Sequence, residues 1–279
     1  FDIAVQYWEC PEAVGNLILV HGYYDHVGLY GSLIDFCREQ RLNLVAFDLP
    51  GHGLSGGEPA RIDDFDQYEA VFFDVYQQAE KQLPALPWLA AGQSTGGAIL
   101  ASYLLKRRPL AGQSGPLEVW LLAPLLRPVG WRSGRWVHAL ARLFVSRVRR
   151  RFALSGNNPL FAEFIASGDP LQSRHLSVHW VTALKRWLAW IERQQPLVYP
   201  VRMIQGTADQ TVDWGYNVPA YQRLFPDLRL TLIEGGHHHL VNETPERLEA
   251  VYRALLSGLD AVLPAKACEW AISVKQVNY

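Results

Sequence analysis

Cysteine and long apolar runs are scarce in this sequence, and their scarcity argues against two classes of protein. The three cysteines, Cys10, Cys37 and Cys268, are widely spaced and form no CxxC motif, which favours a reduced protein over a disulfide scaffold. Arg, Lys or Pro interrupts every apolar run before it is long enough to span a bilayer. No signal peptide is visible, although the chain starts at Phe1 and a preceding segment stays an open alternative. We therefore expect a cytoplasmic protein.

Net charge is also small, at −1, but it is unevenly distributed. Residues 127–193 carry 12 Arg and Lys against three acids, whereas the remainder of the chain is acidic. Such a polarity indicates that the middle stretch is a structural unit with its own exposure. No nucleic-acid recognition motif accompanies the basic residues, so we expect no nucleic-acid partner.

Apolar and aromatic residues, in contrast, are plentiful. The 279 residues are 49% hydrophobic and include 10 Trp, 12 Tyr and 11 Phe, enough for a large core. Strands are predicted at 16–22, at the start of 42–53, and at 88–94, 117–126, 201–209 and 228–236; helices are predicted at 29–41, 64–83, 96–108 and 243–263. This alternation predicts an α/β fold with a mostly parallel central sheet and helices on both faces.

The alternation breaks between residues 127 and 195. This stretch lacks clear strands and contains the basic excess, helical patterns and five tryptophans: Trp131, Trp136, Trp180, Trp187 and Trp190. We interpret residues 127–195 as a helical cap inserted between two strands of the sheet. Residues 1–126 and 196–279 are then the core.

The most specific motif is Gly92-Gln93-Ser94-Thr95-Gly96-Gly97, which lies between a predicted strand and a predicted helix. A GxSxG sequence at such a junction forms a sharp turn that raises the serine hydroxyl above the strand end. Without chemistry, the same residues would be a glycine-rich helix start. The strand before it and the helix after it favour Ser94 as a nucleophile.

A nucleophilic serine needs a base to accept its proton and an acid to orient that base. In the order Ser, acid, His, the sequence places Asp209 and the three histidines 237–239 at the ends of the last two predicted strands. Asp213 is the alternative acid, but it lies a turn beyond the strand end. Side chains that leave a strand in succession point in different directions, so at most one histidine can face Ser94.

An oxyanion hole needs backbone donors beside the nucleophile. The N–H groups of Thr95, at the predicted helix start, and of Tyr23, in the loop after strand 16–22, are the candidates. In that loop, His21 and His26 are expected to shape the backbone through hydrogen bonds.

Five blocks resemble the monoacylglycerol lipases and lysophospholipase-like members of the α/β-hydrolase superfamily. HGYYDHVGLY (21–30) is similar to HGxxEHxxRY, FDLPGHGLSGG (47–57) to DxxGHGxSxG, GQSTGG (92–97) to GHSMGG, GTAD (206–209) to the acid motif, and HHHLVNE (237–243) to the closing HxxxNE or HxxxKE segment. The resemblance implies an α/β-hydrolase fold. It also makes His238, four residues before Asn242, the catalytic base.

The sequence departs from this family pattern at five positions. Gln93 stands where His is usual, Asp25 replaces Glu, Leu29 replaces Arg, and bulky Tyr23 and Tyr24 stand where small residues are frequent. The two tyrosines are expected to narrow the pocket beside the oxyanion hole. Tyr24 and Gln93 are our candidate substrate contacts.

A metal site at the three histidines is disfavoured. Adjacent histidines ligate poorly as a set, and neither HExxH nor a carboxylate cluster accompanies them. We expect no metal and no cofactor. His237 and His239 receive no role.

These residues predict a serine hydrolase that cleaves carboxylic esters through an acyl-enzyme. The resemblance implies a small-molecule lipid substrate with one acyl chain, a monoacylglycerol or a lysophospholipid-like ester. A small-ester esterase, a thioesterase and a peptidase-like acyl hydrolase stay open, because the cap builds the leaving-group pocket. A non-catalytic binding or receptor protein on the same fold is the alternative from another class. Dehalogenase chemistry is disfavoured because the turn carries Ser94 rather than Asp, and the oligomeric state is not predicted.

The cap has two interpretations. Its aromatic residues fit an acyl chain, and its arginines fit peripheral contact with an anionic membrane. Alternatively, the tryptophans form the core of the cap, and the RVRRR stretch at 147–151 is the solvated face of a helix.

Overall fold

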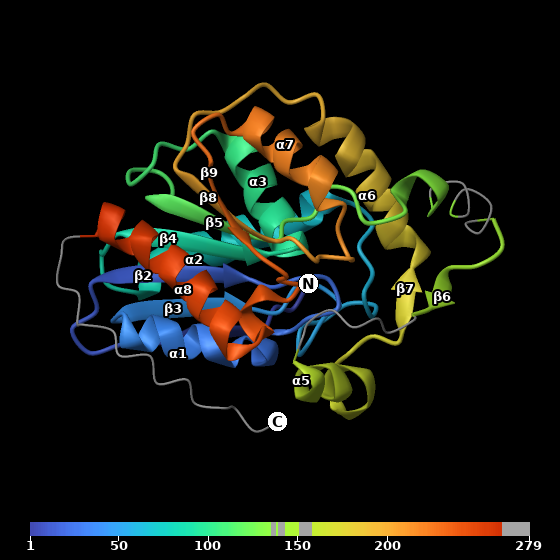
Figure 1. The fold of residues 1–279 in the computed structure, drawn as a ribbon, viewed down its shortest axis with the longest axis horizontal. Helices are drawn as coiled ribbons and strands as arrows, with labels where there is room; N and C mark the ends of the chain where they lie inside the picture. Colours follow the sequence, from blue (N-terminus) through green and yellow to red (C-terminus); the bar gives the residue numbers. More distant parts are fainter. Residues whose placement is uncertain (135–137, 139–142, 151–157, 264–279) are drawn as a thin grey trace.

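The central element of the structure is a seven-stranded sheet of order β1-β3-β2-β4-β5-β8-β9 (Figure 1). This computed structural model describes residues 1–134, 138, 143–150 and 158–263. All neighbouring strands are parallel except β1, which is antiparallel to β3, so the predicted mostly parallel sheet is confirmed. The strands are β1 (Val5–Trp8), β2 (Gly15–Val20), β3 (Leu42–Phe47), β4 (Trp88–Gln93), β5 (Glu118–Leu122), β8 (Val201–Gly206) and β9 (Arg229–Ile233).

Burial follows position in the sheet. Every residue of the five inner strands is buried, as expected where helices cover both faces. The edge strands β1 and β9 are partly exposed. The sequence analysis did not predict β1, whose four residues are too few for a periodic pattern.

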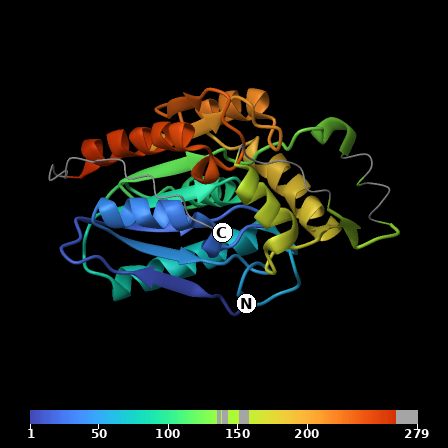
Figure 2. The same ribbon diagram turned by 60° about the horizontal axis from the view of Figure 1, so that its bottom comes forward.

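Helices cover both faces of the sheet (Figures 1 and 2). They are α1 (Gly31–Glu39), α2 (Phe65–Gln82), α3 (Thr95–Arg107), α7 (Trp214–Leu224) and α8 (Pro245–Val262). Alternate residues of one strand enter different cores: Ile18 of β2 packs with the residues of α2, α3 and α7, whereas Leu17 packs with those of α1 and α8. Among these helices only α7 was not predicted.

Polar capping fixes where α2 begins. The Asp64 side chain accepts a hydrogen bond from the backbone of the first turn, and the Gln67 side chain accepts from the Asp64 N–H. Thr244 occupies the predicted cap position of α8, but its side chain makes no capping bond, and Pro245 opens the helix.

Between β5 and β8 the chain leaves the sheet, and we call residues 127–195 the inserted segment. Its elements include α5 (Pro159–Glu163), the short π-helix η2 (Phe164–Gly168), α6 (Val178–Ile191), and the short antiparallel pair β6 (Arg147–Arg149) and β7 (His175–Ser177). The expectation that this segment lacks strands is therefore wrong. The interpretation of residues 147–149 as a helix face is also wrong, because they form strand β6. A strand of three residues is too short to show a detectable alternation in the sequence. Trp136 and Arg151 lie outside the described residues.

Tryptophans of α6 fasten the inserted segment to the core. The Trp187 indole N–H donates to the Ser102 hydroxyl of α3 at 2.7 Å, and its ring stacks on Phe65 of α2 with centroids 5.1 Å apart. Trp180 and Trp187 are both buried. Across the described helices, none has the length and apolarity required to cross a membrane.

Candidate active site

Ser94 lies on a strained turn between β4 and α3. Its backbone adopts φ +51° and ψ −110°, a region that L-residues rarely occupy. A side chain at Gly96 would overlap the Val20 carbonyl oxygen of β2, and one at Gly92 would overlap the backbone of Gly96. The turn therefore needs both glycines. The Ser94 N–H donates to the Leu122 carbonyl of β5 at 2.8 Å, which anchors the turn over the sheet.

His238 and Asp209 lie against each other beyond the ends of β9 and β8. The His238 Nδ1 atom is 2.8 Å from the Asp209 Oδ2 atom, and both side chains are buried. Burial alone would raise the pKa of the Asp209 carboxyl, but His238 and the backbone N–H groups of Thr211 and Val212 outweigh that effect and lower this pKa. A carboxylate held in the charged form is suited to orient an imidazole.

The alternative acid, Asp213, occupies a different place. It precedes α7, and its backbone carbonyl accepts hydrogen bonds from Tyr216 and Asn217. Within the described residues it makes no hydrogen bond to His238. The structure therefore brings Asp209, and not Asp213, to the histidine.

Gln93 connects the serine turn to the histidine loop. Its side-chain amide donates to the His238 carbonyl at 2.8 Å, and the residue is fully buried. The amide oxygen has no hydrogen-bond partner in the described part of the chain. Gln93 therefore holds the backbone of His238 in place, and its contact with substrate stays a prediction.

The two candidate oxyanion donors lie on adjoining loops. A Cβ built on Gly22 would lie only 3.4 Å from the Ser94 Cβ, so the loop that carries Tyr23 adjoins the serine turn. Neither the Tyr23 N–H nor the Thr95 N–H donates to another described residue. Two donors without acceptors beside a serine are available to a developing oxyanion.

A buried carboxylate holds the Tyr23 loop to the histidine loop, and sequence analysis missed it. Asp25 Oδ1 is 3.0 Å from His239 Nε2, while Asp25 Oδ2 accepts from the Tyr30 hydroxyl at 2.8 Å and from the Gly22 N–H at 3.2 Å. Burial would raise the Asp25 pKa, but His239 and Tyr30 lower it overall. No local sequence signal linked Asp25 and His239, which are 214 positions apart.

The two other histidines of this loop do shape it, as predicted. His21 Nε2 accepts from the Leu49 N–H at 2.9 Å, so its Nδ1–H donates to the Gly22 carbonyl at 2.7 Å. His26 Nε2 is 2.9 Å from the Asp169 carboxylate of the inserted segment. That second contact fastens the loop to the inserted segment, a connection that sequence analysis missed.

Aromatic rings line the same side of the loop. The Tyr23 ring stacks on Trp180 of α6 with centroids 3.9 Å apart, and the Tyr24 ring is tilted against it with centroids 4.1 Å apart. The Tyr23 hydroxyl donates to the Ala60 carbonyl at 2.7 Å. The Tyr23 side chain is therefore fixed between the core and the inserted segment.

His237 differs from its two neighbours. It lies beside Glu243, with 3.5 Å between its Nδ1 atom and the carboxylate. In the described ranges, no three His, Cys, Asp or Glu side chains are grouped as metal ligands would be.

A parallel sheet with a strained serine turn and a His–Asp pair at its strand ends defines the α/β-hydrolase class. The chain belongs to the family described as "Serine aminopeptidase, S33", whose model matches residues 11–245. This family and the monoglyceride lipase relatives of the chain make it a serine hydrolase of the carboxylic ester type.

Named relatives are similar over nearly the whole chain. The monoglyceride lipase of Mus musculus is 28% identical over 88% of this chain and 82% of its own length. A phospholipase of Bacillus subtilis is 25% identical over 88% of this chain and 95% of its own. The crystal structure of the Paleococcus ferrophilus monoacylglycerol lipase superposes with a TM-score of 0.78 at 22% identity, covering 93% of this chain and 98% of that one.

Replacing Asp209 by Asn tests the pair. The amide keeps the size of the side chain but favours the wrong histidine tautomer, and turnover should fall by about four orders of magnitude, as in other Ser-His-Asp sites. The measurement is kcat on a chromogenic ester. Asp213→Asn is the matched control and should keep near-normal turnover. Equal losses in both variants would contradict the assignment of Asp209.

Replacing His239 by Ala tests the Asp25 contact. Removing the histidine that contacts this buried carboxylate should cost about 3 kcal/mol of unfolding free energy and lower kcat more than it changes KM, since the Tyr23 loop loses its anchor. The pKa of Asp25 is lowered in the folded protein. Ionised Asp25 therefore contributes to the unfolding free energy at pH values above its unfolded pKa of about 3.9, and this contribution is lost as pH falls. Because the variant lacks the partner that lowers this pKa, its deficit in unfolding free energy should shrink as pH falls below about 4, which urea unfolding at several pH values measures.

His239→Gln supplies a substitute donor and should restore much of the loss. His237→Ala is the control, and its unfolding curve and kcat should match those of the unaltered protein. If His239→Ala leaves both stability and kcat unchanged, the contact has no positioning role.

Proposed function

We propose that this serine hydrolase cleaves a lipid ester with one acyl chain on a glycerol backbone, a monoacylglycerol or a lysophospholipid-like ester. The observation that carries the proposal is the 2.8 Å contact between His238 and Asp209 beside the strained Ser94 turn. Two relatives support the substrate class, since one is named a monoglyceride lipase and the other a phospholipase.

The proposed reaction proceeds through an acyl-enzyme. Ser94 Oγ attacks the ester carbonyl while His238 Nε2 accepts the serine proton, and the Tyr23 and Thr95 N–H groups stabilise the oxyanion. The intermediate then collapses, the bond to the alcohol breaks, and His238 returns the proton to the departing oxygen. Water, deprotonated by the same imidazole, then attacks the acyl carbonyl. The acyl–Oγ bond breaks, the fatty acid leaves, and His238 returns the proton to Ser94 Oγ. Asp209 keeps the imidazole Nδ1 protonated throughout.

The inserted segment is proposed as the cap over the acyl chain. Trp180 contributes an apolar ring next to Tyr23, and α6 connects this wall to the core through Trp187. Tyr24, in the same loop, is the proposed substrate contact. Because the described residues of the segment add no strand to the central sheet, the segment is free to shape a pocket.

An ester panel tests this function. Fluorophosphonate should label Ser94, and a monoacylglycerol should be hydrolysed faster than a short-chain ester, a thioester or an aminoacyl anilide. Ser94→Ala and His238→Ala should each lower kcat by about 10⁶-fold, the loss typical of such residues. His237→Ala should retain near-full turnover. Failure of Ser94 to label in folded protein would overturn the proposal, and a preference for the anilide would redirect it to a peptidase.

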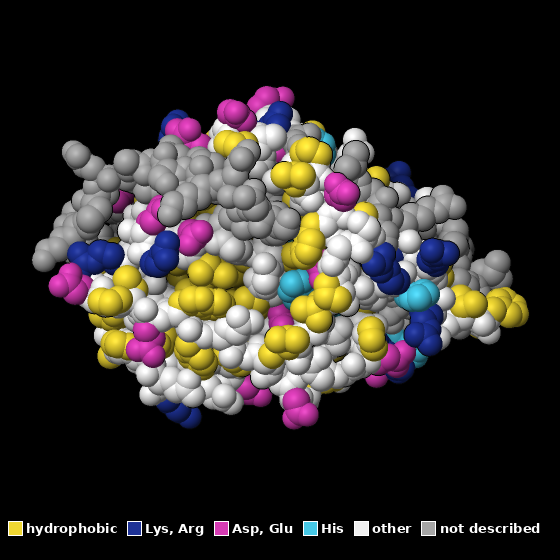
Figure 3. All heavy atoms as spheres, turned by 90° about the horizontal axis from the view of Figure 1, so that it is seen from below, with side chains coloured by type: hydrophobic (Ala, Val, Ile, Leu, Met, Phe, Trp, Pro, Cys, Tyr) yellow, Lys and Arg dark blue, Asp and Glu magenta, His cyan; other side chains and the backbone are white. Residues whose placement is uncertain are grey.

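Peripheral contact with an anionic membrane from the cytoplasm is a further part of this proposal. Leu143 and Phe144, 67% and 78% exposed, precede the basic strand β6 at the far end of the inserted segment. Basic and apolar side chains gather at that end of the molecule in Figure 3. Free thiols at Cys10 and Cys37 support a reducing compartment.

Phe144→Ser should weaken co-sedimentation with anionic vesicles several-fold, because a large exposed ring no longer enters the lipid interface. Leu110→Ser is the control, because it removes a similarly exposed apolar side chain from the surface outside the inserted segment. The Leu110 variant should bind vesicles as the unaltered protein does. If vesicle binding depends neither on lipid charge nor on Phe144, the proposed membrane contact is contradicted, and the proposed ester hydrolysis is unaffected.

A further inference from the structure

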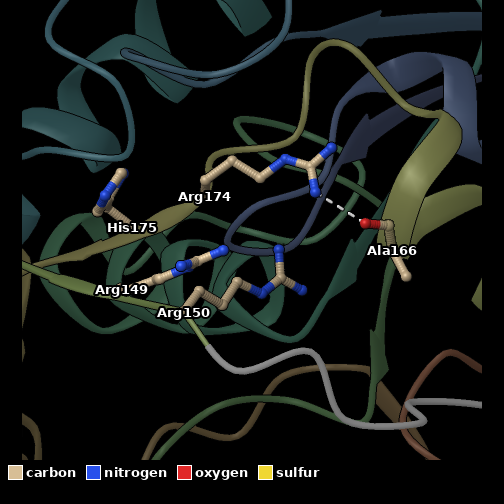
Figure 4. A pocket seen from close by; sticks show the side chains of 5 residues that line it. All are labelled: Arg149, Arg150, Ala166, Arg174 and His175. Atoms are coloured by element: carbon tan, nitrogen blue, oxygen red, sulfur yellow. Dashed lines mark hydrogen bonds between the residues drawn. The ribbon is translucent and has the colours of Figure 1, made fainter.

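Three arginines surround one cavity in the inserted segment. The cavity has a volume of about 650 Å³ and is lined by Arg149, Arg150, Ala166, Arg174 and His175. Figure 4 shows that these residues approach it from β6, from the start of β7 and from η2. None of the five is acidic. The ester hydrolysis proposed above uses none of them.

Specific contacts hold two of the guanidinium groups in place. The Arg150 side chain donates to the Gln172 amide oxygen at 2.6 Å, and that of Arg174 donates to the Ala166 carbonyl at 2.8 Å (Figure 4). Burial lowers the Arg150 pKa, and repulsion from Arg174 adds to that effect. The cavity therefore concentrates positive charge that an anion would stabilise.

The neighbouring acid does not neutralise this charge directly. Asp169 lies between Ala166 and Arg174 in the sequence, but it is only 2% exposed, and its carboxylate contacts His26 and the Leu171 N–H. For Arg149, the described residues offer no ion pair. An anion in the cavity would thus meet the Arg149 guanidinium without displacing a carboxylate of the described residues.

The cavity adjoins the ester site through two tyrosine rings. The Arg150 guanidinium lies over the Tyr24 ring, 3.9 Å from its centroid. Tyr24 in turn contacts the ring of Tyr23, whose backbone N–H is a proposed oxyanion donor. The ring contacts of Tyr24 therefore connect Arg150 to the loop that carries the proposed oxyanion donor.

We infer that this arginine cavity binds the phosphate of the substrate's head group, and that the preferred ester is an acylated glycerol phosphate. Three guanidinium groups, two from consecutive residues at the end of β6 and one from the residue before β7, suit a tetrahedral anion with several free oxygens better than a planar carboxylate. Such a subsite would select the phosphate-bearing ester over the uncharged monoacylglycerol. This inference rests on the proposed ester hydrolysis.

The test compares two esters with the same short acyl chain, a monoacylglycerol and its 3-phosphate, both below micelle-forming concentrations. The unaltered protein should show a higher kcat/KM on the phosphate. Arg149→Gln should lower that value by about tenfold, mainly through KM, as loss of one charge-assisted contact predicts. Its kcat/KM on the monoacylglycerol should not change.

Arg147→Gln is the matched control, because it removes the same charge from the same strand but does not line the cavity. It should leave both esters unaffected. If Arg147→Gln and Arg149→Gln act equally, general charge attraction explains the effect and the subsite is overturned. Equal kcat/KM for the two esters in the unaltered protein also overturns it.

Calorimetry on the Ser94→Ala protein tests the cavity independently of turnover. Glycerol 3-phosphate should bind, and Arg149→Gln should weaken its binding about tenfold, whereas Arg147→Gln should not. Inorganic phosphate that binds as tightly as glycerol 3-phosphate would overturn the head-group assignment, because the cavity would then recognise the free anion. If neither ester is hydrolysed but this binding pattern holds, the proposed function fails and the cavity assignment stands.

Discussion

Backbone packing without intervening side chains determines how closely the loops of this site approach one another. At Gly96 the start of α3 lies against the end of β2, and at Gly206 the end of β8 lies against the carbonyls of Gly236 and His237. A Cβ at either glycine would overlap backbone atoms, which cannot rotate away as a side chain would. The serine turn and the His–Asp pair lie at the carboxyl ends of parallel strands. The backbone can pack this closely there because Gly96 and Gly206 carry no side chain.

Much of this arrangement could be predicted from local sequence, because the determinants are short and contiguous. A window of about ten residues is enough to recognise the GxSxG turn, the position of Asp209 at a strand end and the buried apolar runs. The choice of His238 needed the family resemblance, since strand geometry alone left three histidines open. The structure then gives each histidine a different carboxylate: Glu243, Asp209 and Asp25 in chain order.

The features that were missed depend on residues far apart in the sequence. Asp25 and His239 are separated by more than 200 positions, and so no local pattern links them. The contact of His26 with Asp169 crosses from the core to the inserted segment. The strands β6 and β7 are too short to show alternation and exist because they pair with each other. Such contacts appear only when the chain is folded.

The inserted segment is connected to the core only through the ends of two strands in the sequence. It joins β5 to β8, which are neighbours in the sheet, so its length and sequence can change without shifting the register of any central strand. The serine turn and the His–Asp pair lie at the carboxyl ends of the strands, whereas the proposed cap over the acyl chain lies in the insertion. Substitutions confined to the insertion, about a quarter of the chain, should therefore alter the proposed acyl pocket while the positions of Ser94, Asp209 and His238 stay fixed by the sheet.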